Sequence, residues 1–503
     1  MKSSASIPVV DIFAGAGGLG EGFEASGGGG RFHVALSAEM DRHAVATLRT
    51  RAFFHSFPNG DAPKSYYDYL AGNQTVPWGS AEQHLWEMAS DRVCEIELGR
   101  VDHDRYLDER ISAVADQASK SGLPWVLVGG PPCQAFSLVG RARNRGIANY
   151  VPENDGRHFL YQHYLHILAK HRPAVFVLEN VKGMLSSQVG GEHIFAEIFQ
   201  QLKQPGGPRG PRYRIEPVYQ HIPGTWRPKD FIVRCEKLGI PQNRHRVILL
   251  GILEDLPSAG TLDDHPHIPS VQEMIGDLPE VRSDATDQTI RSWPKFAATQ
   301  LVSCARYASA IDHRTSQHLR ALAKMARTDS DPSTGARWLP ATGKSSLPKH
   351  LRPLMYDRRM KGVLQHQTRP HMTPDLQRYA YASAFAWNNN RSPKGAAEFP
   401  DELHPKHRNW TASSHFVDRF KVQRWDTPSS TITSHLAKDG HYFIHPDPRQ
   451  MRSLTVREAA RLQTFPDNFI FEGPAGAQRK QVGNAVPPWL GHEIAGLVSK
   501  ILR

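Results

Sequence analysis

The chain has 503 residues, enough for roughly two to four domains of ordinary size. Apolar residues make up 39% and charged residues 22%, which is typical of a folded globular protein and excludes wholesale disorder. With 61 Lys and Arg against 50 Asp and Glu, the formal net charge is +11. This surplus favours a polyanionic partner, although many basic proteins bind no nucleic acid.

Neither a membrane span nor secretion is expected. No stretch approaches the ~18 uninterrupted apolar residues of a transmembrane helix, and residues 1–10 lack the pattern of a signal peptide. The four cysteines (Cys94, Cys133, Cys235 and Cys304) are widely separated and form no CxxC pair. We therefore expect no disulfide framework, no structural zinc site and a cytoplasmic location.

Short apolar runs alternate with helical periodicity over the first 250 residues. We expect strands at residues 7–13, 34–38, 125–129, 174–178 and 246–251, and helices at 159–171 and 193–202. This alternation predicts an α/β fold in which helices cover both faces of a mostly parallel sheet.

The amino-acid composition changes after residue 255. Residues 256–450 are rich in Pro, Ser, Thr, His and Arg, which predicts a smaller, irregular second domain of loops and short strands. Regular secondary structure is expected again in an amphipathic helix at 454–463 and in the segment 483–502. Residues 55–98 are interpreted as an insertion, either an interaction surface or a mere loop extension. The predicted units are therefore 1–255, 256–450 and 451–503.

The first motif is a glycine turn at residues 15–20, which fits G-x-G-x-x-G between a strand and a helix. A tight turn that binds nothing is the alternative interpretation. Glu39 ends the next strand, 19 residues after the turn, where a carboxylate can hold a ribose diol. A nicotinamide dinucleotide and S-adenosylmethionine both contain such a ribose. Asp11, just before the turn, suits a cationic amino-acid moiety better than a pyrophosphate.

The second motif, G-G-P-P-C-Q-A-F-S at residues 129–137, follows a buried strand at its carboxyl end. This is where α/β sheets place their ligands. Pro131 and Pro132 stiffen the backbone and deliver Cys133 in a fixed direction. The alternative, Cys133 as a small buried hydrophobe, is more typical of a cysteine inside a helix or strand.

Two further motifs carry polar side chains. Glu179 ends an apolar strand, where a carboxyl group in a low-dielectric cleft can carry a proton; a purely structural role is equally open. Gln242, Arg244 and Arg246 alternate along an extended segment and so are expected to converge on one side. The two arginines suit an anion or a carbonyl group, or else pair with surface carboxylates.

Together these motifs resemble, in order, those of DNA (cytosine-5)-methyltransferases. The similarity extends to the C-terminal part, where L-T-V-R-E-A-A-R-L-Q-T-F-P at 454–466 resembles the penultimate motif of that family and Q-V-G-N-A-V-P-P at 481–488 resembles its last. The resemblance covers most of residues 7–251 and 452–495.

This resemblance implies a Rossmann-like catalytic domain that uses S-adenosylmethionine and no metal. Residues 256–450 would be the target-recognition domain. The implied reaction is methyl transfer to C5 of a cytosine flipped out of a specific duplex DNA sequence. Such an enzyme is expected to act as a monomer on DNA at the bacterial nucleoid, with a cognate restriction endonuclease as a possible functional partner.

The resemblance also implies roles for the catalytic residues. The Cys133 thiolate would add to C6, Glu179 would share a proton with N3, and Arg244 would support the O2 side of the base. Arg246 and Gln242 complete this catalytic set.

For the cofactor, the resemblance implies that Phe13 stacks on the adenine, Glu39 binds the ribose and Asp102 contacts the adenine amino group. Met40 stands where the family often has an aromatic residue, which implies weaker stacking. Asn484 and Val486 would close the pocket. The other residues expected at the cofactor are Asp11, Ala14, Gly15, Gly17, Gly18, Leu19 and Pro131.

For DNA, the resemblance implies a segment after Cys133, residues 137–158, that closes over the duplex. The DNA contacts expected from this segment and from the second domain are Ser137, Arg141, Arg143, Arg157, Thr431 and Lys438.

Three alternatives differ in substrate or activity. One branch of the same family methylates tRNA, but its members have a more compact second domain than the roughly 200 residues between 251 and 452. An inactive DNA-binding paralogue predicts loss of Cys133 or Glu179, and both are present. A nicotinamide-dependent dehydrogenase explains only the glycine turn.

Overall fold

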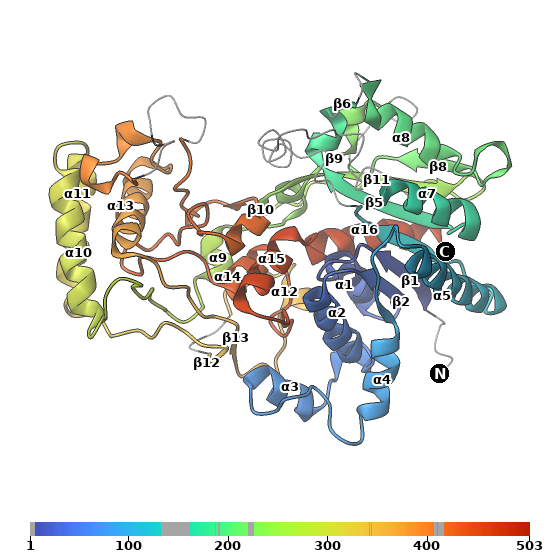
Figure 1. Ribbon diagram of the computed structural model, residues 1–503, viewed down its shortest axis with the longest axis horizontal. Helices are drawn as coiled ribbons and strands as arrows, with labels where there is room; N and C mark the ends of the chain where they lie inside the picture. The colour runs from blue at the N-terminus through green and yellow to red at the C-terminus, as the bar shows by residue number, and fades with distance from the viewer. Residues whose placement is uncertain are drawn as a thin grey trace.

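The computed structural model describes residues 6–131, 160–186, 188–189, 192–219, 226–341, 343, 345–406, 410 and 417–503. A large α/β lobe and a smaller helical lobe lie on either side of the C-terminal segment (Figure 1). No helix of the described ranges has the length and apolar character to cross a membrane.

The main sheet has the order β3-β2-β1-β4-β5-β11-β8, and β9 also pairs with β11. Strands β3, β2, β1, β4 and β5 are parallel, whereas β11 is antiparallel to both β5 and β8. The strands in chain order are β1 Ile7–Ile12, β2 Phe32–Glu39, β3 Val93–Glu95, β4 Val126–Gly129, β5 Val175–Val181, β6 Gln188–Val189, β7 Glu192–His193, β8 Tyr213–Glu216, β9 Ile232–Arg234, β10 Gln242–Asn243, β11 His245–Leu253, β12 Trp338–Pro340, β13 Gly362–Leu364 and β14 Ser429–Ser430.

Helices cover both faces of this sheet. The helices are α1 Gly18–Ala25, α2 Arg42–Phe54, α3 Lys64–Ala71, α4 Gln83–Asp91, α5 Val101–Lys120, α7 Leu160–His171, α8 Ile194–Lys203, α9 Val271–Ile275, α10 Trp293–Ala308, α11 His313–Ala326, α12 Arg352–Met355, α13 Thr373–Asn389, α14 Val456–Leu462, α15 Ala475–Asn484 and α16 Pro488–Ile501. The five strands predicted from the sequence are β1, β2, β4, β5 and β11, and the predicted α/β fold is confirmed.

The buried strands contribute side chains to two hydrophobic cores, one on each face of the sheet. Along β1, Ile7 and Val9 enter the core shared with α1 and α16, while Val10 and Ile12 enter the core shared with α5 and α7. Because both faces are buried, the strand is apolar almost throughout instead of alternating with polar residues. This is why the apolar runs of the first half could be recognised as strands.

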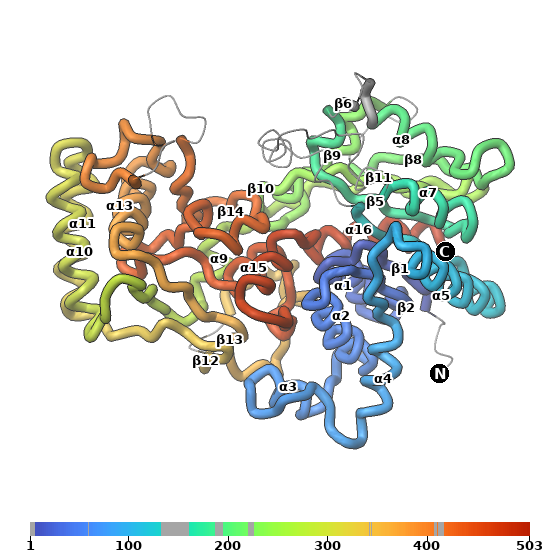
Figure 2. Tube along the Cα trace, in the orientation of Figure 1, coloured from blue at the N-terminus to red at the C-terminus, as the bar shows by residue number. Residues whose placement is uncertain are grey.

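The end of the chain returns to its beginning. Helix α16 packs on α1 so closely that a Cβ added at Gly22 would lie 2.3 Å from the carbonyl oxygen of Pro488. Figure 2 shows this return, with the red C-terminal tube beside the blue N-terminal one. The α/β lobe is therefore built from both ends of the chain.

The region predicted as an insertion, residues 55–98, folds into α3, α4 and β3. Strand β3 pairs with β2 as the edge of the main sheet, so the predicted insertion extends too far toward the C-terminus. The rest forms an aromatic cluster in which Phe53, Phe54 and Tyr66 pack with Leu364 and Ile470. The inserted helices therefore join α2 to the second half of the chain.

The second region is more helical than the sequence predicted. Helices α10, α11 and α13 pack together around a core of small and aromatic side chains that includes Leu301, Ala305, Leu319, Ala380 and Tyr381. The prediction of loops and short strands is wrong for this bundle. Alanine-rich inner faces give a weak hydrophobic pattern, which the many Pro, His and Arg of the flanking loops obscured.

Candidate functional site

The glycine turn leaves β1 through a run of left-handed backbone. Phe13, Gly15 and Gly17 all have positive φ, at 55°, 57° and 82°. Phe13 is not a glycine, and such a conformation costs on the order of 1 kcal/mol and is typical of functional turns. A Cβ at Gly15 would meet nothing within 4 Å, so the turn has an open side there.

Glu39 ends β2, as the sequence predicted, and its carboxylate lies against this turn. Its Oε2 accepts a hydrogen bond from the Gly15 backbone N–H at 2.8 Å, and its Oε1 accepts from Met40 and Asp41 at 3.0 and 2.8 Å. The carboxylate is thereby fixed in orientation by main-chain donors. The Met40 side chain is 61% exposed beside it.

Asp11 is a buried carboxyl group directly before the turn. Burial raises its pKa to about 8, a backbone hydrogen bond at Gly20 opposes this rise, and the negative Glu39 adds to it. Its Oδ2 is buried and has no hydrogen-bond partner within the described ranges. An acidic pair beside an open glycine turn fits a cationic, ribose-containing cofactor such as S-adenosylmethionine and disfavours a pyrophosphate.

The C-terminal segment closes the turn from one side. A Cβ at Gly18 would lie only 1.9 Å from the carbonyl oxygen of Val486, so only glycine allows this contact. Asn484 is exposed at the end of α15. Leu19 turns its side chain into the core, and Ala14 packs beside Val45 and Leu48 of α2.

Asp102 does not lie at a strand end with Glu39. It occupies the first turn of α5, is exposed and pairs with Arg100 at 3.0 Å. The residue level with Glu39 on the neighbouring strand is Glu95, at the carboxyl end of β3. The sequence prediction missed Glu95 because β3 has only three residues and was assigned to the insertion.

Glu179 and Arg246 form a buried ion pair beside the second motif. Arg246 Nε lies 2.8 Å from Glu179 Oε1, and both side chains are more than four-fifths buried. A Cβ at Gly130 would lie 2.8 Å from Glu179 Oε2, and Asn180 Nδ2 donates to the Pro131 carbonyl oxygen at 3.3 Å. The end of β5 thus packs on the first residues of the motif that contains Cys133.

Gln242 and Arg244 converge, but on a different target from Arg246. Gln242 Oε1 accepts from the Ile432 N–H at 2.9 Å, and Arg244 donates to the carbonyl oxygens of Ile432 and Ala485 at 2.8 and 2.7 Å. Both side chains are fully buried. The two arginines expected to converge therefore have separate partners, and the place beside Glu179 belongs to Arg246.

The predicted nucleophile and several predicted DNA contacts lie outside the described residues. These are Cys133, Ser137, Arg141, Arg143 and Arg157.

Thr431 lies at the junction of the two lobes. Its hydroxyl donates to the Asn243 carbonyl oxygen at 2.5 Å, next to the parallel pairing of β10 with β14. A cavity of about 480 Å³ opens beside both residues. Its basic lining residues are Arg391, Lys394, Lys421 and Arg424. Lys438 follows the short helical turn Ser434–Ala437.

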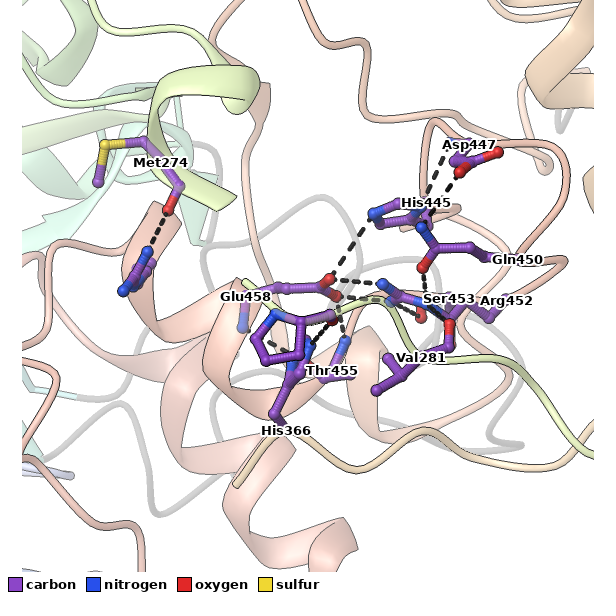
Figure 3. A network of polar contacts seen from close by, with 12 residues as sticks. Met274, Val281, His366, His445, Asp447, Gln450, Arg452, Ser453, Thr455 and Glu458 are labelled. Atoms are coloured by element: carbon purple, nitrogen blue, oxygen red, sulfur yellow. Dashed lines mark hydrogen bonds and ion pairs between the residues drawn. The ribbon is translucent and has the colours of Figure 1, made fainter. Parts of the chain in front are cut away.

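A buried polar network anchors the second lobe to α14 (Figure 3). Arg452 donates to both carboxylate oxygens of Glu458 at 2.7 and 2.6 Å, and His445 Nε2 lies 3.7 Å from the same carboxylate. Glu458 Oε2 also accepts from the Thr455 N–H, and the Thr455 hydroxyl contacts His366 Nδ1 at 2.9 Å. Burial lowers the pKa of His366 to about 4 and that of His445 to about 3.

Metal ligation has no candidate within these ranges, because no three His, Cys, Asp or Glu side chains of the described residues are grouped to hold an ion.

The chain is similar to known proteins over nearly its whole length. It is 30% identical over 521 aligned residues to the type II methyltransferase M.Bpa9945I of Bacillus paralicheniformis, covering 98% of this chain and 99% of that protein. It is 27% identical to the type II methyltransferase M.AgeI of Thalassovita gelatinovora, with 97% of each chain covered.

A solved structure shares the fold. It is described as a DNA modification methyltransferase encoded within a prophage (E. coli), with 18% identity, a TM-score of 0.53 and 99% of both chains covered. A family model described as C-5 cytosine-specific DNA methylase matches residues 108–500. The chain therefore belongs to the C-5 cytosine-specific DNA methylase family.

Proposed function

We propose that this protein methylates C5 of a cytosine flipped out of a specific duplex DNA sequence, through a transient covalent bond between Cys133 and C6. The observation that carries the proposal is the buried Glu179–Arg246 pair, which packs on Gly130 at the start of the Pro-Pro-Cys motif. The pair puts an acid and a cation next to the segment that delivers the thiol.

The reaction needs these residue types because cytosine C5 is a poor nucleophile. Addition of the Cys133 thiolate to C6 makes the ring enamine-like and C5 nucleophilic. Negative charge develops toward N3, where a proton held by Glu179 offsets it. After C5 has accepted the methyl group, loss of its proton breaks the C6–S bond and restores the thiolate. Because C6 is shielded inside a stacked duplex, the base must leave the stack.

Arg246 takes the role that the resemblance gave to Arg244. Its Nε holds Glu179 and its Nη1 donates to the His245 carbonyl oxygen at 2.9 Å. Among the described residues, Nη2 has no hydrogen-bond partner, which leaves this amino group to donate to the O2 carbonyl of the base. Arg244 instead holds the C-terminal segment and residue 432 in place.

S-adenosylmethionine supplies the methyl group when it is bound. Glu39, already oriented by three backbone donors, has lone pairs left for the ribose hydroxyls. Burial keeps a proton on Asp11 below about pH 8, and a bound cationic amino-acid end would favour its ionised form. Phe13 is available to stack on the adenine. We assign the adenine amino group to Glu95, which is level with Glu39, in preference to Asp102.

The second lobe is the proposed target-recognition domain, and a partner endonuclease would make the protein one half of a restriction–modification system. Support comes from the cations around the 480 Å³ cavity beside Thr431. Phosphate contacts by such side chains position a duplex, whereas base specificity depends on the placement of a few other groups.

The test compares the wild-type protein with Cys133→Ser. The variant is expected to bind duplex DNA and S-adenosylmethionine with unchanged affinity and to transfer no methyl group. Turnover retained by Cys133→Ser would overturn the covalent mechanism. Transfer to tRNA, but not to duplex DNA, by the wild-type protein would overturn the proposed substrate.

A further inference from the structure

The hairpin formed by α10 and α11 has a charge distribution that the proposed function does not use. Residues 291–327 contain seven Lys and Arg and one acid, Asp312. This local surplus of six is more than half of the surplus of eleven in the whole chain. All seven cations are exposed: Arg291, Lys295, Arg306, Arg314, Arg320, Lys324 and Arg327.

These cations have no acidic partners among the described residues, in contrast to exposed arginines elsewhere. Arg100 pairs with Asp102, and Arg391 with Glu398. The one acid of the hairpin is occupied, because Asp312 accepts hydrogen bonds from Thr315 and Asn389. Two further acids directly follow the hairpin: Asp329 pairs with Arg449, and Asp331 accepts a hydrogen bond from the Trp293 backbone N–H. Among the described residues, the seven cations of the hairpin are therefore left without a carboxylate partner.

The cations are arranged in rows along the helices. On α10, Lys295 and Arg306 lie on one face, 11 residues or about 16 Å apart. Arg320 and Lys324 of α11 and Arg327, which caps that helix, follow each other at spacings of four and three residues, which also places them on one face. A 16 Å row matches about five base-pair steps of 3.4 Å along one DNA strand.

The hairpin lies away from the catalytic lobe. In Figure 1, α10 and α11 form the outer edge of the second lobe, and α13 stands between them and the rest of the molecule. Their inner faces are used up in packing with α13 through residues such as Leu301, Cys304, Leu319 and Ala323. The cationic faces therefore point to solvent, outside the junction where Glu179 and Thr431 lie.

We propose that the α10–α11 hairpin is a second, sequence-independent docking surface for the phosphate backbone of duplex DNA outside the recognition cleft. This inference rests on the proposed function only in that the protein works on DNA. Such a surface holds the enzyme on long DNA while the cleft is empty or has released its product, because phosphate binding is independent of sequence and needs only an unneutralised cation row.

The test removes the charge from one row and uses a matched control. The hairpin variant is Arg320→Gln, Lys324→Gln and Arg327→Gln. The control variant is Arg105→Gln, Lys120→Gln and Arg209→Gln, three exposed residues of the catalytic lobe, which lowers the net charge by the same three units.

Each protein is saturated with a short, unlabelled duplex that contains its recognised site. A fluorescent duplex of unrelated sequence is then added at low salt, and its binding is followed by anisotropy. We expect the wild type and the control to bind the labelled duplex, and the hairpin variant to bind it about tenfold more weakly, with a smaller dependence on salt. Equal binding by the hairpin variant and the wild type would overturn the proposal, as would an equal loss in the control.

Methylation of the short duplex separates this inference from the proposed function. All three proteins are expected to methylate it at the same rate. If the wild type does not methylate it, the proposed function fails, whereas the anisotropy result still decides whether the hairpin binds DNA.

Discussion

At the scale of single residues, two arginines two positions apart have opposite tasks. Arg244 is 1% exposed and satisfies two buried main-chain carbonyl groups, whereas Arg246 is held beside Glu179. Burial and partner type distinguish a side chain that holds the fold from one that we propose to face the reacting base.

This difference predicts a split between activity and stability. Arg246→Ala should slow single-turnover methylation by about 10²–10³-fold because it removes one preorganised donor, with little change in melting temperature. Arg244→Ala should lower the free energy of unfolding by about 1–3 kcal/mol for each carbonyl group left unpaired. The assignment would be contradicted if Arg244→Ala kept its stability but slowed methylation while Arg246→Ala methylated at the normal rate.

Asp11 predicts an unusual dependence of stability on pH. Because its pKa of about 8 in the folded protein lies above its ordinary value of 3.8, its contribution is complete at low pH and is lost as pH rises from about 4 through 8. Asp11→Asn should remove this dependence. Urea unfolding of both proteins at pH 5 and pH 8.5 measures it, and parallel changes in the two proteins would refute the buried carboxyl group.

At the scale of elements, close backbone approach explains why the two ends of the chain make one site. Gly18 of α1 touches Val486, and a Cβ at Gly483 would lie 2.2 Å from the backbone of Thr433. The glycine turn, the C-terminal segment and the second lobe therefore share one tightly packed junction.

Gly18→Ala should weaken S-adenosylmethionine binding, because the added methyl group must displace residue 486 from the turn. Gly496→Ala is the control, since its Cβ would meet nothing within 4 Å on α16 and alanine favours a helix by about 1 kcal/mol. Equilibrium dialysis with labelled cofactor compares the two. Equal affinity in both variants would show that the contact is not part of the cofactor site.

Some elements and site residues could be predicted from the sequence, and others could not. Strands buried on both faces, such as β1 and β5, are apolar runs bounded by turns, and the polar residues at their ends carry the motifs. Glu95 was missed because a three-residue edge strand has no periodicity to detect. The different partners of Arg244 and Arg246 come from residues 432 and 485 in one case and Glu179 in the other. Alternation along an extended segment does not contain these tertiary contacts. Cys133 stays a prediction.

At the scale of the whole molecule, buried histidines lie where the lobes meet. Burial lowers the pKa of His366 to about 4 and those of His371 and His445 to about 3. Because these imidazoles are neutral in the folded protein, protonating them should weaken the attachment of the second lobe.

Acid should therefore destabilise the protein. Because these pKa values lie below the ordinary 6.5, the unfolded chain binds protons first, and stability that is complete above about pH 6.5 is lost as pH falls toward 4 and 3. Each imidazole contributes about 1.4 kcal/mol per pH unit within that range. His445→Gln should flatten the pH dependence of urea unfolding, and His313→Gln, at an exposed position, should not. An unchanged slope in His445→Gln would contradict this account.

Whether this chain methylates cytosine in duplex DNA can be measured by bisulfite sequencing. Unmethylated genomic DNA is incubated with S-adenosylmethionine and the protein, and bisulfite sequencing then locates protected cytosines. We expect protection at one cytosine within a single short sequence motif, and no protected cytosine when Cys133→Ser replaces the wild-type protein. Complete conversion of every cytosine after treatment with the folded wild-type protein would contradict it.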